Sequence, residues 1–142
     1  MDLNIVTDDN DDEAQRAAAE VSTVTVKVGR IYDQATDQDG NRVLVDRLWP
    51  RGMSKSRADI AEWCKQVAPS TALRKWYSHD PQRFAEFRRR YRVELGTGEH
   101  ATALAHLREL ATDRALTLLT ASKDPFISEA AVLAELLQER PQ

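Results

Sequence analysis

The chain's first predicted strand begins near Val24, where hydrophobic and polar positions alternate. Residues 24–29 read VTVKVG, with apolar side chains every second residue, the period of a β-strand. Turn-forming residues follow at 37–41, and a second strand is predicted over 42–48. The centre of that strand, Val43-Leu44-Val45, is continuously apolar, which predicts burial on both faces. Pro50 and Gly52 end the strand.

The middle of the chain changes to helical spacing. Residues 58–67 fit either period, and the following Pro69 and Ser70 favour a short strand, because Ser70 is a good N-cap for a helix over 70–77. Asp80 and Pro81 open the next helix. Its apolar stripe is predicted to face the core and consists of Phe84, Phe87 and Tyr91.

The last third of the chain repeats the alternation of helix and strand. Gly96 and Gly98 separate the preceding helix from one predicted over 100–112. Residues 115–121, ALTLLTA, predict a buried strand, and 125–139 predict a final helix. Buried strands that alternate with amphipathic helices predict an α/β fold with three layers, in which a small, mostly parallel sheet is flanked by helices.

Composition divides the chain into a tail and one domain. Residues 1–20 carry seven of the 23 acidic side chains and one of the 20 basic ones, which leaves 16 acidic and 19 basic elsewhere. We therefore predict a disordered acidic tail over 1–22 and a single, mildly basic α/β domain over 23–142. A solubilising role is the simplest interpretation of the tail, and shielding of a basic site in cis is the alternative.

Cysteine usage and hydropathy predict the compartment. Cys64 is the single cysteine, so no intrachain disulfide can form, and its apolar neighbours favour an inert buried thiol. No apolar run has the length of a membrane span and no signal peptide is recognisable, so we expect a cytoplasmic protein. The sequence contains no phosphate loop, Rossmann glycine pattern, nucleophile elbow or zinc spacing, and we expect no cofactor and no metal.

Charged clusters follow three of the predicted strands. The first strand ends in Arg30-Ile31-Tyr32-Asp33, the second in DRLWPRG (46–52), and the late strand in Ser122-Lys123-Asp124. If the strands are parallel, the three clusters meet at one edge of the sheet, where ligands of α/β proteins bind. Guanidinium groups match carboxylate and phosphate, which predicts an anion site. Its predicted ligand-binding residues are Arg30, Tyr32, Arg47, Trp49, Arg51, Arg74, Lys123 and Asp124.

Two residues are candidates for proton transfer at this site. Asp46 could act as a general acid or base, or it could orient Arg47 or Arg51. His79 is a candidate because histidine is a common general acid or base, and the alternative is a loop histidine that helps to cap a helix. Trp49 could stack on a planar ligand or pack beneath Arg51 as a cation–π partner. The structural alternative for the whole cluster is a set of Arg–Asp pairs that closes a loop onto the sheet.

Four stretches of the chain resemble a known family. They are Arg30-Ile31-Tyr32-Asp33, RVLVDRLWPRG (42–52), residues 69–91 and LTLLTASKD (116–124). Together they resemble the YeaO-like branch of domain of unknown function 488, over about residues 26–138. The resemblance implies an α/β domain in a bacterial cytoplasm and no established activity. Family members commonly have Asn-His shortly after the last of these stretches, whereas this chain has Ser128-Glu129.

Two functions follow as hypotheses. The first is an enzyme or binding protein for a small anionic or phosphorylated ligand at residues 46–52. The second is a regulatory module that binds nucleic acid through the basic helix from Arg83 to Arg92. Residue types alone leave catalysis open, because the Ser128-Glu129 pair removes the histidine that the resemblance implies. Glu129 or His79 would have to replace it.

Overall fold

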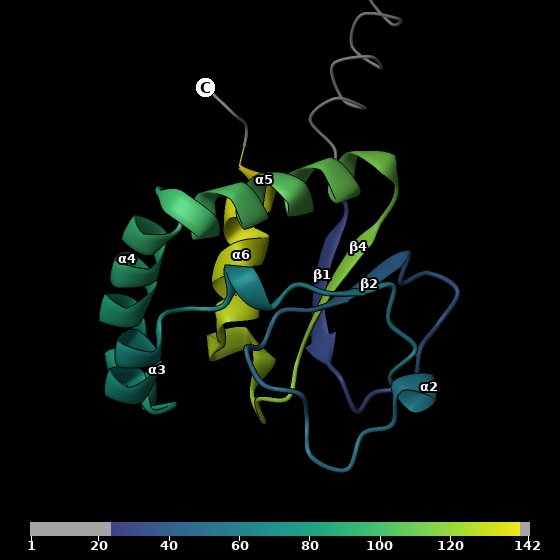
Figure 1. The fold of residues 1–142 in the computed structure, drawn as a ribbon, viewed down its shortest axis with the longest axis horizontal. Coiled ribbons are helices and arrows are strands. Elements are labelled where there is room, and N and C mark those ends of the chain that lie inside the picture. Colours follow the sequence, from purple (N-terminus) through teal and green to yellow (C-terminus); the bar gives the residue numbers. More distant parts are fainter. Residues whose placement is uncertain (1–23, 140–142) are drawn as a thin grey trace, which may run out of the picture.

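The protein is described by a computed structural model, which places residues 24–139 (Figure 1). Its centre is a four-stranded sheet in the order β1-β4-β2-β3, with every neighbouring pair parallel. The strands are β1 (Val26–Arg30), β2 (Asn41–Leu44), β3 (Glu62–Trp63) and β4 (Leu116–Thr120). The predicted α/β fold and parallel sheet are therefore confirmed, and the carboxyl ends of β1, β2 and β4 lie at one edge.

One face of the sheet is covered by the larger helices. These are α3 (Thr71–Tyr77), α4 (Phe84–Glu94), α5 (Gly98–Asp113) and α6 (Glu129–Gln138). Helix α6 lies directly against β1 and β4, α4 packs on α6, and α5 runs across one end of the group (Figure 1). The predicted stripe of Phe84, Phe87 and Tyr91 does face this core, with Tyr77 stacked on Phe87 at 4.2 Å between ring centroids.

The opposite face has a thinner cover. Alternation along the strands sends Leu44 and Leu119 to this side, where they pack with Ile31, Met53 and Ala58. The segment between β2 and β3, which contains the short helix α2 (Lys55–Ala58), supplies this layer. The central strands are thus buried on both faces, as their continuous apolar runs predict.

Some helices and strands end at other residues than predicted, because side chains form hydrogen bonds with backbone groups at these ends. The second strand was predicted to reach 48, but regular pairing ends at Leu44 because the chain turns away once Asp46 binds the end of β4. The region 58–67 contains β3 and a 3₁₀ turn, Lys65–Val67, so the short-strand interpretation holds for two residues. The last helix begins at Glu129 rather than 125, because Ser128 accepts a hydrogen bond from the backbone N–H of Ala130.

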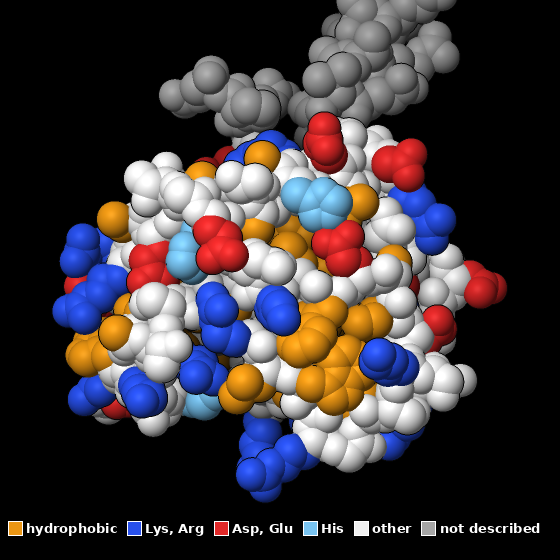
Figure 2. All heavy atoms as spheres, viewed as in Figure 1, with side chains coloured by type: hydrophobic (Ala, Val, Ile, Leu, Met, Phe, Trp, Pro, Cys, Tyr) orange, Lys and Arg blue, Asp and Glu red, His pale blue; other side chains and the backbone are white. Residues whose placement is uncertain are grey.

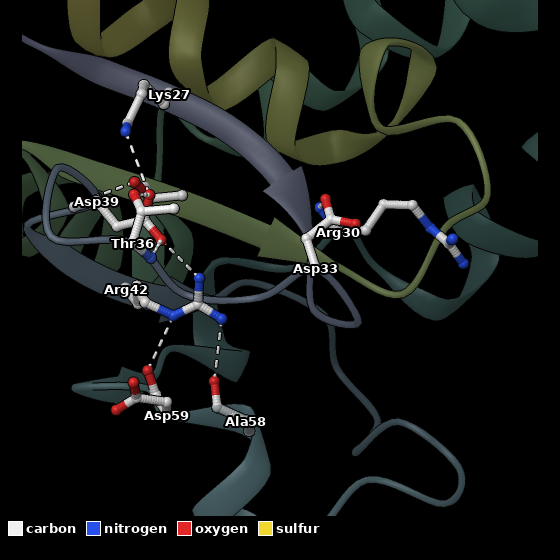
Figure 3. A network of polar contacts seen from close by, with 9 residues as sticks. Lys27, Arg30, Asp33, Thr36, Asp39, Arg42, Ala58 and Asp59 are labelled. Atoms are coloured by element: carbon white, nitrogen blue, oxygen red, sulfur yellow. Dashed lines mark hydrogen bonds and ion pairs between the residues drawn. The ribbon is translucent and has the colours of Figure 1, made fainter.

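A polar network lies at the amino ends of the strands, away from the edge where the three clusters meet (Figure 3). Arg42 on β2 donates to the Asp39 carboxylate at 2.8 Å and to the carbonyl oxygens of Asp59 and Ala58 at 2.9 and 3.1 Å. Burial alone raises the pKa of Asp39, but hydrogen bonds from Thr36, Arg42 and Lys27 outweigh it and hold that pKa well below its usual range. This network joins the turn before β2 to the thin layer.

Candidate functional site

A cavity of about 390 Å³ opens at the carboxyl edge of the sheet. It is bounded by the loop after β2, the end of β4, helix α3 and the first turn of α6, which brings together residues far apart in sequence. Seven of the ten predicted site residues line it: Tyr32, Asp46, Arg47, Trp49, Arg51, Arg74 and His79.

Asp46 has both carboxylate oxygens engaged. Oδ1 accepts a hydrogen bond from Thr120 Oγ1 and Oδ2 accepts one from the Ala121 backbone N–H, each at 2.8 Å. Its backbone carbonyl accepts from Trp63 Nε1 at 2.7 Å. Asp46 therefore fastens the end of β2 to the end of β4 and to β3. The predicted ion pair with Arg47 or Arg51 does not form, since no carboxylate lies within 4.0 Å of either guanidinium in residues 24–139.

Glu129 was not among the ten predicted site residues, although it was named as a possible replacement for the absent histidine. It is the first residue of α6, it lines the cavity, and its carboxyl lies near the Asp46 carboxyl and the Thr120 hydroxyl, which affect its pKa. Burial of the carboxyl, followed by the neighbouring Asp46, raises the pKa of Glu129 well above its usual range. The two carboxyls therefore lie close enough to influence each other in the cavity. A signal was present in the sequence, because Ser128 is a strong N-cap that directs the next residue into the first helical turn.

Three arginines line the same cavity. Arg47 and Arg51 come from the loop after β2, and Arg74 comes from α3. Arg47 and Arg74 are half-buried and Arg51 is exposed. The Nε of Arg47 is buried and has no hydrogen-bond partner among the described residues, an unusual state for a charged donor. The arrangement leaves guanidinium donors available inside a cavity.

Trp49 is held against the protein rather than beneath Arg51. Its Nε1 donates to the Met53 carbonyl at 2.7 Å, which closes the loop, and its ring meets Trp63 edge-on at 5.3 Å between centroids. The predicted cation–π contact with Arg51 is not among those formed by residues 24–139, where Lys65 is the cation over Trp63. Trp49 nevertheless lines the cavity. Gly52 has open space around it, and its φ of +72° lies in the left-handed region that favours glycine.

His79 lies at the mouth of the cavity in unusual backbone. It and Ser78 have φ values of +56° and +49°, the left-handed region that non-glycine residues rarely occupy. The His79 ring lies 6.1 Å from the Tyr77 ring, centroid to centroid. The capping role falls to Asp80, whose carboxylate accepts from the Gln82 backbone N–H. Two consecutive non-glycine residues in the left-handed region cost free energy. This backbone conformation places His79 in the cavity lining.

Three predicted site residues do not line the cavity. Arg30 donates from Nε to the Ser122 carbonyl at 3.2 Å, and its guanidinium group lies over the Tyr32 ring. Lys123 is exposed outside it. Asp124 caps the 3₁₀ turn Pro125–Ile127 by accepting from the Phe126 N–H. The clusters do meet at one edge, but the exit loop of β4 leads its charges away from the cavity.

The other sequence predictions concern the single cysteine, metal binding, membrane spans and the tail. Cys64 is buried as predicted, and burial raises the pKa of its thiol to about 11, which disfavours the reactive thiolate. Residues 24–139 contain no group of three or more His, Cys, Asp and Glu side chains arranged to hold a metal. No helix within that range is long and apolar enough to cross a membrane. The acidic tail predicted over 1–22 lies outside the described residues.

Comparison with known proteins identifies relatives along most of the chain. A family model described as "Inactive DUF488-N3 subclade" matches residues 25–142. The uncharacterised protein Rv3073c of Mycobacterium tuberculosis is 47% identical over 120 residues, which is 84% of this chain and 99% of the relative. The uncharacterised protein YeaO of Escherichia coli is 39% identical over 115 residues, 81% of this chain and 98% of YeaO. No solved structure matches significantly. The chain therefore belongs to the DUF488 family, as a YeaO-like member of unestablished function.

Proposed function

We propose that the protein binds a small anionic molecule, such as a phosphate ester or a carboxylate, in the cavity at the carboxyl edge of the sheet. The observation that carries this proposal is the set of three arginines, Arg47, Arg51 and Arg74, that line one cavity without a carboxylate partner within residues 24–139. An anion would supply the partner that the buried Nε of Arg47 lacks.

The residues of the site support ligand binding better than they support catalysis. Asp46 is the first candidate for proton transfer, but both of its carboxylate oxygens accept hydrogen bonds, from Thr120 and Ala121. The positions where the family resemblance implies Asn-His hold Ser128 and Glu129, and Ser128 is occupied as a helix cap. The family model's own description as inactive agrees with binding without turnover. His79, the other predicted proton-transfer residue, is exposed and lines the cavity.

The basic helix gives less support to nucleic-acid binding. In α4 and the turn before it, Arg83, Arg88, Arg89, Arg90 and Arg92 each lie within 4.0 Å of a carboxylate. Lys and Arg side chains gather over the lower half of one face, below α5 (Figure 2), but those of α4 are interleaved with acids. Neutralised arginines release fewer counterions from a polyanion. We therefore rank this hypothesis second.

Calorimetric titration with inorganic phosphate, pyrophosphate, nucleoside monophosphates and small carboxylates tests the proposal. Arg51→Met and Arg74→Met should each weaken the best anion by about tenfold or more, since a charge-assisted hydrogen bond contributes about 1.5–3 kcal/mol. Arg114→Met is the matched control, because Arg114 is exposed at the far end of α5 and should leave affinity unchanged. Failure of every anion to bind at low salt, or equal losses in the control, would refute the proposal.

A further inference from the structure

The cavity contains both signs of charge, and they are not paired with each other. Asp46 and Glu129 line it together with Arg47, Arg51 and Arg74. In residues 24–139 no nitrogen of these arginines lies within 4.0 Å of a carboxylate oxygen. Opposite charges in one small cavity normally attract each other into direct contact, which lowers their joint cost of desolvation. Their separation leaves two charged sites for a ligand to fill.

The carboxyl site is built by the fold. Thr120 Oγ1 and the Ala121 N–H fix the Asp46 carboxylate from the end of β4 at 2.8 Å each. Glu129, in the first turn of α6, lines the same cavity as Asp46 and Thr120. The two neighbouring carboxyls offer acceptor lone pairs to the cavity.

The neighbouring hydroxyl groups are already engaged. Tyr77 on α3 also lines the cavity, but its hydroxyl donates to the Ile127 carbonyl. Tyr91 on α4 is fully buried and donates to the Val67 carbonyl. Neither tyrosine is free to donate to the carboxyl pair, so a donor for its remaining lone pairs has to come from solvent or from a ligand.

A simple anion would match only one of the two charged sites in this cavity. It would bind the guanidinium groups but would also face the negative carboxyl pair, with a repulsive contribution inside a partly enclosed site. A molecule with an anionic group at one end and an ammonium group at the other would satisfy both charged sites. The ammonium group supplies several donors for the carboxyl oxygens.

We propose, on the basis of the anion-binding function above, that the ligand is a small zwitterion whose anionic end meets Arg47, Arg51 and Arg74 and whose amine meets the Asp46–Glu129 pair. This assigns Glu129 a binding role as the residue that selects amine-bearing ligands. The Asp46 side chain holds the sheet edge together and positions the Glu129 carboxyl.

Matched pairs of ligands test the inference on the full chain by calorimetry at pH 7 and low salt. The probes are aminoalkyl phosphates with two, three or four methylenes and alkyl phosphates of the same length, with 4-aminobutyrate and butyrate as the carboxylate pair. We expect at least a tenfold advantage for the amine at one chain length. In Glu129→Gln that advantage should fall below about threefold, while the alkyl phosphate keeps its affinity or gains some.

The possible results separate the two proposals. Alkyl phosphates that bind as tightly as every aminoalkyl phosphate would overturn the zwitterion inference and leave anion binding in place. An amine advantage that survives in a folded Glu129→Gln protein would overturn the role of Glu129. Absence of binding by any phosphate or carboxylate would overturn both proposals. The comparison of ligands on the unmodified chain decides the ligand class even if the variant fails to fold.

Discussion

Replacement of Asp39 by alanine tests whether the network at the amino ends of the strands stabilises the fold. The substitution removes the acceptor for Arg42 Nη1 at 2.8 Å and for Lys27 Nζ at 3.2 Å, as well as two hydrogen bonds from Thr36 (Figure 3). Arg42 then keeps only its bonds to the carbonyls of Asp59 and Ala58. Its positive charge stays buried without a counterion.

The magnitude follows from the exposure of the partners. The side chains of Arg42 and Asp39 are 6% and 12% exposed, and breaking one partner of a buried ion pair costs about 3–5 kcal/mol. The Lys27 side chain is 41% exposed, so its contact adds little. Thr36 is exposed and can bond to water instead. We expect a loss near the lower limit, about 3 kcal/mol, or about 10–15 °C in Tm for a domain of this size.

Urea denaturation, followed by tryptophan fluorescence and far-UV circular dichroism, measures this loss. Lys27→Met is the matched control and should change the free energy of unfolding by less than about 1 kcal/mol. The double variant Asp39→Ala with Arg42→Met completes a cycle whose coupling energy should be about 2 kcal/mol or more. Since the folded pKa of Asp39 is depressed, its contribution is present above pH 4 and lost as pH falls below that value.

Two results would refute this reasoning. The first is an Asp39→Ala protein within about 1 kcal/mol of the unmodified chain at pH 7. The second is a stability difference between the two proteins that does not shrink as pH falls from 4 toward 2. Either would mean that water replaces the carboxylate at no cost, and that the network is a consequence of the fold rather than a cause of its stability.

Three further predictions concern single positions. Glu129→Gln should gain stability relative to the unmodified chain as pH rises above 4.5, because the raised pKa of Glu129 makes its contribution full below that pH and smaller as pH rises through the folded value; parallel stability curves from pH 4 to 9 would contradict this. Gly40→Ala should cost at least about 2–3 kcal/mol of unfolding free energy in urea, since φ is +63° and the new Cβ would clash with the Ala115 carbonyl oxygen, whereas Gly52→Ala, with open space, should cost only about 1 kcal/mol; equal costs would reject the close-approach argument. Ser70→Ala should lose about 1–2 kcal/mol of unfolding free energy, because its Oγ accepts from the Leu73 N–H at 3.2 Å and caps α3; a loss below 0.3 kcal/mol would show that the cap is dispensable.

Local patterns were sufficient for the elements and their order. The apolar run at Val43-Leu44-Val45 predicted a strand buried on both faces, and both clusters of the core contain its residues. Ser70 predicted the start of α3, and Asp80 with Pro81 the start of the next helical segment, because caps satisfy backbone groups within four residues. Such signals depend on neighbours in sequence, so they can be read without the fold.

Long-range contacts decided the ends of elements and the contents of the cavity. The carboxyl edge could be predicted from parallel strands, and it did gather Asp46, Arg47 and Arg51 with Arg74. Arg30 and Lys123 carry the same charge at equivalent strand ends, yet the direction in which each loop leaves the sheet excludes them.

The DRLWPRG segment also shows which features the sequence predicts and which depend on the tertiary structure. Its residue types alone indicated an anion site at the end of a strand. Only the tertiary structure placed Glu129, 83 residues after Asp46, in the same cavity and so gave that cavity a second carboxyl group. Sequence determines which donors and acceptors exist and the local conformation around them. Which ones share a low-dielectric cavity depends on packing between distant segments, and that packing sets their protonation and their partners.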